Sequence, residues 1–102
     1  MQSNINNGIL RRAHEIFEDL VQIRRELHQI PEPGFEETKT SRFIADILQK
    51  WDIAHLQGVA GTGIIASIDS SPAKKTVALR ADMDALPVDE QNDLPFRSKH
   101  KG

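Results

Sequence analysis

The chain has 102 residues, 38% of them hydrophobic and 5% aromatic, so it holds one modest domain or part of a larger one. Thirteen basic and fifteen acidic residues give a net charge of -2, which favours neither nucleic acid nor an anionic membrane surface as a partner. Cysteine is absent, which excludes internal disulfides and thiolate ligands, and no apolar run is long enough to span a membrane. We therefore expect a cytoplasmic protein.

The first predicted element is a helix over residues 9–28. Apolar side chains recur there at steps of three and four, as on one face of a helix. The apolar members of this face are Ile9, Leu10, Ala13, Ile16, Phe17, Leu20, Val21 and Leu27. Residues 1–8 are polar, so we expect a flexible N-terminus followed by a single unit over 9–102. Pro31 and Pro33 end the helix.

A second helix is predicted over residues 39–50, where the helical spacing returns. Its apolar positions are Phe43, Ile44, Ile47, Leu48 and Trp51. Thr38 and Thr40 are both possible N-caps. The connection 28–37 contains a histidine, three acids and two prolines. We interpret it as a shaped turn rather than a ligand cluster, with Phe35 filling the core.

The periodicity then changes to that of strands. Residues 53–56 are a possible extended edge, and 64–68 and 76–79 are predicted strands joined by a turn over 69–74. So short a connection makes these two strands antiparallel neighbours. The predicted fold class is α/β, with two helices followed by antiparallel strands of an incomplete sheet. The open edge of such a sheet would allow self-association.

The most informative residues are Asp82 and Asp84, which directly follow the last predicted strand. If the strand continues that far, their spacing places both carboxylates on one face. The carboxyl ends of strands line the ligand crevice of open α/β sheets, and a carboxylate pair there can bind a hard cation or orient a histidine ligand. The alternative is a loop, in which one aspartate caps a turn and the other is solvated.

Other interpretations of the possible functional residues have less support in the sequence. The pair Asp82–Asp84 could belong to a phosphatase or a metal-dependent sugar transferase, but the residues on either side of it fit poorly. His14, His55 and His100 are lone histidines without a second ligand at helical or strand spacing. We therefore interpret these histidines as surface residues rather than metal ligands.

Several segments together resemble one enzyme family. They are 27–32, 34–38, 61–63, the string Leu79-Arg80-Ala81-Asp82-Met83-Asp84-Ala85-Leu86-Pro87, Glu90, and 94–96 with Ser98. In order and spacing this set is similar to the start of the N-acyl-amino-acid amidohydrolases. These are aminoacylase-type metallopeptidases that include hippurate hydrolases, auxin-conjugate hydrolases and N-acetyl-diaminopimelate deacetylases.

The resemblance implies the start of the catalytic domain of a two-domain enzyme, whose smaller lid domain mediates dimerisation. The implied reaction is hydrolysis of the amide of an N-acyl amino acid. A pair of divalent metals of the Zn, Mn, Co or Ni type would lower the pKa of a bridging water from about 15.7 toward 7. By the same resemblance, Asp82 and Asp84 lie at the site and support it, rather than acting as its principal ligands.

In the family, the segment matching 98–102 leads into a Met-His-Ala-Cys-Gly-His-Asp stretch that supplies the first metal ligands. That stretch, the base glutamate and the lid domain have no counterpart in residues 1–102. We therefore expect a truncated N-terminal piece that binds no metal and is inactive on its own. The alternative is a non-catalytic interaction module derived from the same family.

Overall fold

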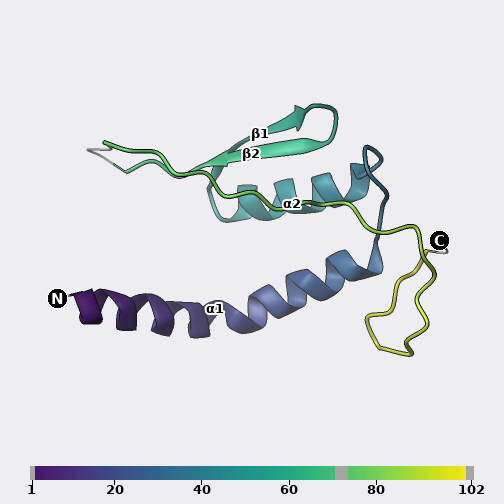
Figure 1. Ribbon diagram of the computed structural model, residues 1–102, viewed down its shortest axis with the longest axis horizontal. Coiled ribbons are helices and arrows are strands. Elements are labelled where there is room, and N and C mark those ends of the chain that lie inside the picture. Colours follow the sequence, from purple (N-terminus) through teal and green to yellow (C-terminus); the bar gives the residue numbers. More distant parts are fainter. Residues whose placement is uncertain (1, 71–73, 101–102) are drawn as a thin grey trace.

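The computed structural model, which describes residues 2–70 and 74–100, contains two helices, one hairpin and a long irregular segment (Figure 1). The helices are α1 (Gln2–Gln29) and α2 (Thr38–Lys50), and the strands are β1 (Ala54–Val59) and β2 (Gly63–Ser67). This arrangement confirms the predicted α/β class with two helices followed by antiparallel strands, but the pair is β1 with β2 and not 64–68 with 76–79. None of the helices in the described part of the chain is long and apolar enough to cross a membrane.

Helix α1 begins at Gln2 rather than at Ile9, so the polar segment expected to precede the helix forms its first turns. Its last turn closes where Ile30 N–H donates to Leu27 O (3.1 Å), just before the first proline. Several apolar side chains of α1 remain exposed, including Ile9 (64%) and Phe17 (57%). The amphipathic face of this helix is therefore largely unfilled by the rest of the described chain.

Helix α2 confirms the second predicted helix and packs on the hairpin (Figure 1). Beyond its C-terminus, Asp52 adopts a left-handed φ of 56° and Ile53 N–H donates to Leu48 O (2.9 Å), which closes the helix end. Ala45, on this helix, is the one apolar residue among the described residues that is buried. The core therefore lies beneath α2 and is small.

The hairpin pairs β1 and β2 in the antiparallel register Ala54↔Ser67 to Leu56↔Ile65. The register shifts before Val59↔Gly63, which marks a bulge next to the turn. A Cβ at Gly63 would lie 2.6 Å from the carbonyl oxygen of Val59, so only glycine allows the strands this approach.

The prediction of a strand over residues 76–79 is wrong, because this segment forms no strand in the structure. A strand needs a neighbouring backbone, and no described segment pairs with this one. Val77 is 87% exposed and Leu79 is 99% exposed. Figure 1 shows the segment running past α2 toward the α1–α2 connection without entering the sheet. The turn predicted over 69–74 includes 71–73, which lie outside the described residues.

The prediction that Phe35 fills the core is also wrong. Its side chain is 86% exposed and its backbone has a left-handed φ of 67°. The tight turn explains this, because Glu36 N–H donates to Pro33 O (3.0 Å) and Phe35 N–H donates to the Glu37 carboxylate (3.0 Å). These two bonds fix the backbone in a conformation that directs the ring outward.

Candidate functional site

The two aspartates singled out from the sequence lie beside the α1–α2 connection. Ala85 N–H donates to Glu32 O (2.8 Å), which anchors the segment that carries them. Asp84 Oδ2 lies 3.8 Å from where a Cβ on Gly34 would be, so this carboxylate faces the turn. Asp82 Oδ1 accepts a hydrogen bond from Arg80 Nε (3.2 Å), and both of these side chains are mostly exposed.

Both aspartates line a groove of about 1060 Å³. Its walls come from the C-terminal half of α1, one face of α2, strand β2 and the segment 79–92. Leu27, Ile44 and Ile64 make much of the lining apolar. The structure therefore places the two carboxylates together at an open, largely apolar groove.

Glu32 fastens the start of α2. Its carboxylate accepts hydrogen bonds from Thr40 N–H (2.6 Å), Thr40 Oγ1 (2.7 Å), Lys39 N–H (3.1 Å) and Thr38 Oγ1 (3.3 Å). The predicted threonine caps are therefore wrong, because the N-cap position is Glu37 and no side chain at that position bonds the helix N–H groups. A carboxylate from the preceding turn caps the helix instead and complements the positive end of its dipole.

The hydrogen bonds to Glu32 also set its protonation. Partial burial raises the pKa of this carboxyl, but the bonds from Thr40, Lys39 and Thr38 outweigh that effect and hold the pKa below its usual value. The hydrogen bonds therefore favour the ionised carboxylate, as its capping role requires.

We expect Glu32→Ala to lower the free energy of unfolding by about 1 kcal/mol, the usual cost of losing a helix cap. Chemical denaturation followed by circular dichroism measures this effect. Glu36→Ala is the matched control, because no described residue donates a hydrogen bond to the Glu36 side chain. Equal stability of the Glu32 and Glu36 variants would contradict the capping role.

Glu37 joins the hairpin to the start of α2. Its carboxylate accepts a hydrogen bond from Thr62 Oγ1 (2.6 Å) in the β1–β2 turn and a second from Phe35 N–H. The Thr62 hydroxyl is the main reason that the pKa of Glu37 lies below its usual value. Glu37 therefore links the turn of the hairpin to the start of α2.

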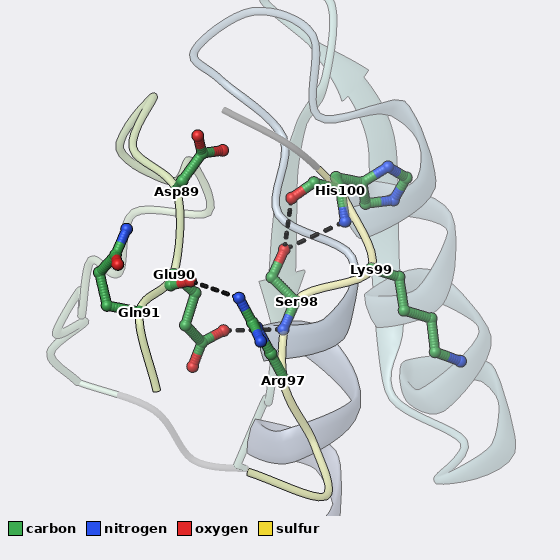
Figure 2. Close-up of a pocket in the computed structure, with 7 residues that line it drawn as sticks. All are labelled: Asp89, Glu90, Gln91, Arg97, Ser98, Lys99 and His100. Carbon is green, nitrogen blue, oxygen red and sulfur yellow. Dashed lines mark hydrogen bonds between the residues drawn. The ribbon is translucent and has the colours of Figure 1, made fainter. Parts of the chain in front are cut away.

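Glu90 joins the C-terminal segment to α1, and Figure 2 shows its bonds to Ser98 and Arg97 within that segment. Glu90 Oε1 lies 2.9 Å from His28 Nε2, and Oε2 accepts a hydrogen bond from Ser98 N–H (2.7 Å). Arg97 Nη2 donates to the Glu90 backbone carbonyl (2.8 Å). The Ser98 N–H is the first cause, and His28 the second, of a Glu90 pKa below its usual value.

Phe96 completes this attachment. Its ring meets the His28 ring edge-on at 5.7 Å, and the Arg25 guanidinium lies 4.6 Å from its centroid. Lys99 N–H donates to Gln29 O (3.1 Å). Beside these contacts lies a pocket of about 380 Å³ lined by residues 89–91 and 97–100 (Figure 2). Within this lining, Arg97 and Ser98 both bind Glu90, through its backbone carbonyl and its carboxylate respectively.

The described residues contain no group of three or more histidine, cysteine, aspartate or glutamate side chains that could hold a metal ion. His28 pairs with Glu90, and His55 Nδ1 lies 2.8 Å from Ile53 O. Neither ring lies with the two aspartates as a ligand cluster. Asp82 and Asp84 therefore do not form a metal site with any third ligand in the part of the chain that the structure describes.

The tethering roles of Glu32, Glu37 and Glu90 are what sequence reasoning missed. The interpretation of the 28–37 connection as a shaped turn agrees with the structure. Their partners, however, lie 8, 25 and 62 residues away along the chain. No local spacing rule reports contacts of that kind.

Known proteins share both the sequence and this fold. The chain is 51% identical over 83 residues to an N-acetyldiaminopimelate deacetylase from Anoxybacillus flavithermus. The matched region covers 80% of this chain and 22% of that protein. No protein-family model matches the chain.

Two crystal structures superpose on the chain. The first, a protein from methicillin-resistant Staphylococcus aureus assigned as an aminohydrolase, has a TM-score of 0.89 at 38% identity and covers 95% of this chain. The second, a dinuclear metal-binding peptidase of family M20 from Bacillus subtilis, has a TM-score of 0.81 at 39% identity and covers 87% of this chain. The chain spans about a quarter of the length of these relatives.

Proposed function

The chain is homologous to the metal-dependent amidohydrolases and peptidases of family M20, and on this basis we propose that it forms part of the catalytic domain of such an enzyme. The observation that carries the proposal is the shared fold at a TM-score of 0.89 over nearly the whole chain. Two aspartates lie together at the edge of the large groove in this fold.

Within that domain we assign Asp82 and Asp84 a supporting role. The chain lacks a third ligand beside them among its described residues, so they do not fit a metal pair by themselves. Their carboxylates can instead orient a ligand that another part of the enzyme supplies. Asp84 is suited to this role because the segment around it is anchored at Ala85.

The proposed substrate is an N-acyl amino acid, in line with the deacetylase among the relatives. The proposed cofactor is a divalent metal pair of the Zn, Mn, Co or Ni type, in line with the dinuclear peptidase. We place the enzyme in the cytoplasm, because the absence of cysteine suits a reducing compartment. Nucleic acid and membrane surfaces are not proposed as partners.

A chimera tests this function. Residues 1–102 would replace the matching region of the Anoxybacillus deacetylase, and hydrolysis of N-acetylated amino acids would be measured with and without a chelator. We expect hydrolysis that depends on metal, whereas the chain alone should give no turnover, because its described residues contain no complete ligand set. A soluble, metal-loaded chimera without activity, or chelator-sensitive turnover by the chain alone, would contradict the proposal.

A second candidate function is a non-catalytic interaction module. The exposure of Val77 (87%) and Leu79 (99%) favours it, because apolar side chains in an unpaired segment suit strand addition. Self-association through the open hairpin edge is its simplest form. Light scattering over a range of concentrations distinguishes the two functions, since an interaction module forms a defined complex in solution without any hydrolysis.

A further inference from the structure

Glu90 closes a loop over residues 90–98 at one end of the groove. Its carboxylate uses a separate oxygen for each of two segments: Oε1 lies 2.9 Å from His28 Nε2 on α1, and Oε2 accepts a hydrogen bond from Ser98 N–H (2.7 Å). Its backbone carbonyl accepts another from Arg97 Nη2 (2.8 Å), as Figure 2 shows. This one residue therefore both closes the loop on itself and attaches it to the helix.

The Glu90 carboxylate is well held in this position. Its side chain is only 13% exposed. The pKa of this carboxyl lies below its usual value, first because Ser98 N–H donates to it and next because of His28. Hydrogen bonds to an ionised carboxylate are stronger than neutral ones, and a buried donor that loses its acceptor is costly. An apolar side chain at this position therefore cannot replace the function of Glu90 in the loop.

The loop also has attachments to α1 that do not involve Glu90. The Phe96 ring meets the His28 ring edge-on, and the Arg25 guanidinium lies 4.6 Å from its centroid. Lys99 N–H donates to Gln29 O (3.1 Å). All three α1 residues lie in the last turns of the helix. We therefore expect the loop to stay near α1 when Glu90 is changed, but in a less well-defined position.

The closed loop forms part of the same groove as the two aspartates. His28, Glu90 and Ser98 line this groove together with Asp82 and Asp84. The segment that carries the aspartates has its own anchor, on the α1–α2 connection. Because the loop and the aspartates are anchored separately, the shape of the groove between them depends on how firmly Glu90 holds the loop.

We propose that Glu90 is a positioning residue, which holds loop 90–98 on α1 and thereby fixes one wall of the groove that Asp82 and Asp84 line. This inference rests on the proposed function, because a positioning role requires a reaction in the groove. It assigns Glu90 no contact with substrate or metal. A displaced wall slows the reaction, since a misplacement of about 1 Å can cost on the order of 100-fold in rate.

Amide hydrogen exchange of the complete chain at neutral pH measures how firmly the loop is held. Ser98 N–H reports the closure by Glu90, and Lys99 N–H reports the attachment to α1. In Glu90→Ala, both amides should exchange about 10-fold faster or more, because Ser98 N–H loses its acceptor and His28 its partner. Glu90→Gln keeps a neutral acceptor and should recover part of this protection.

Asp93→Asn is the matched control, because Asp93 is exposed on the same loop and does not line the groove. It should change the exchange of both amides by no more than about twofold. Equal effects of Asp93→Asn and Glu90→Ala would overturn the proposal, as would a Glu90→Gln variant that exchanges as fast as Glu90→Ala. Equally faster exchange throughout α2 would also overturn it, because Glu90 would then stabilise the whole fold and not this loop.

Hydrolysis by the deacetylase chimera tests whether the position of the loop matters to the reaction. We expect kcat/KM to fall about 10-fold or more in Glu90→Ala, to recover partly in Glu90→Gln and to stay unchanged in Asp93→Asn. Full activity of Glu90→Ala would overturn the positioning role. If Glu90→Ala unfolds the chimera, Glu90→Gln decides, and parental kcat/KM in that variant would overturn the role.

The two measurements separate this inference from the proposed function. If no chimera hydrolyses an amide, including the one without a substitution, the proposed function is rejected together with the positioning role. The exchange of Ser98 and Lys99 then still shows whether Glu90 holds the loop. An active chimera whose kcat/KM does not respond to Glu90 rejects the positioning role alone.

Discussion

Asp84→Asn in the deacetylase chimera is expected to lower the rate of amide hydrolysis by about 10- to 100-fold, the usual cost of losing a group that orients a metal ligand. Asparagine keeps the size of the side chain and its place beside Gly34 but removes the negative charge. Asp82→Asn should act in the same direction. The measurements are kcat/KM at saturating metal and the metal content of the purified variants.

Asp46→Asn is the control for both variants, since Asp46 is exposed on α2 and does not line the groove. It should leave hydrolysis unchanged. If the Asp82 and Asp84 variants also retain full activity and metal content, the loop interpretation is correct and the two aspartates are solvated turn residues. If activity falls but the chimera also unfolds, thermal denaturation identifies a structural role instead.

The parts of the fold that the sequence predicts are those with a regular local period. Helix α2 and strand β2 follow directly from their apolar spacing. The strand predicted at 76–79 has equally favourable residues, yet it forms no strand, because a strand depends on a neighbour. The composition of the segment indicates that it can form a strand, but without a neighbouring strand it stays irregular here.

The candidate site also has features that the sequence predicts and features that it does not. The string around Asp82 and Asp84 identifies the family, and the similarity to known amidohydrolases confirms that resemblance. The roles of the two aspartates stay predictions. Glu32 and Glu37 could not be assigned from the sequence, because each binds a donor that only the folded chain brings near. The outward position of Phe35 is likewise not predictable from the sequence, since a turn at positive φ gives no periodic signal.

Glu32, Glu37 and Glu90 together explain how so small a core holds its shape. Each carboxylate joins two segments: Glu32 joins the turn to α2, Glu37 joins the start of α2 to the hairpin turn, and Glu90 joins α1 to the C-terminal segment. Charged hydrogen bonds of this kind are stronger than neutral ones. They position the groove walls without requiring the apolar surface between them to be covered.

Acidification is therefore expected to unfold the isolated chain. The pKa values of Glu32, Glu37 and Glu90 all lie below the usual 4.5, so the unfolded chain takes up protons more readily than the folded chain does. The stability these carboxylates contribute is fully present above about pH 4.5 and is lost as the pH falls through their lowered pKa values. Circular dichroism and urea denaturation at a series of pH values measure this loss.

The variant with glutamine at all three positions separates this cause from general acid effects. It should be less stable than the parent chain at neutral pH, and its stability should depend less on pH below 4.5, because the groups that take up protons on unfolding are gone. Glu36→Gln should leave the pH profile of the parent chain intact. A triple variant with the parent's full acid sensitivity would show that other carboxylates hold the fold, and that the hydrogen bonds to Glu32, Glu37 and Glu90 do not.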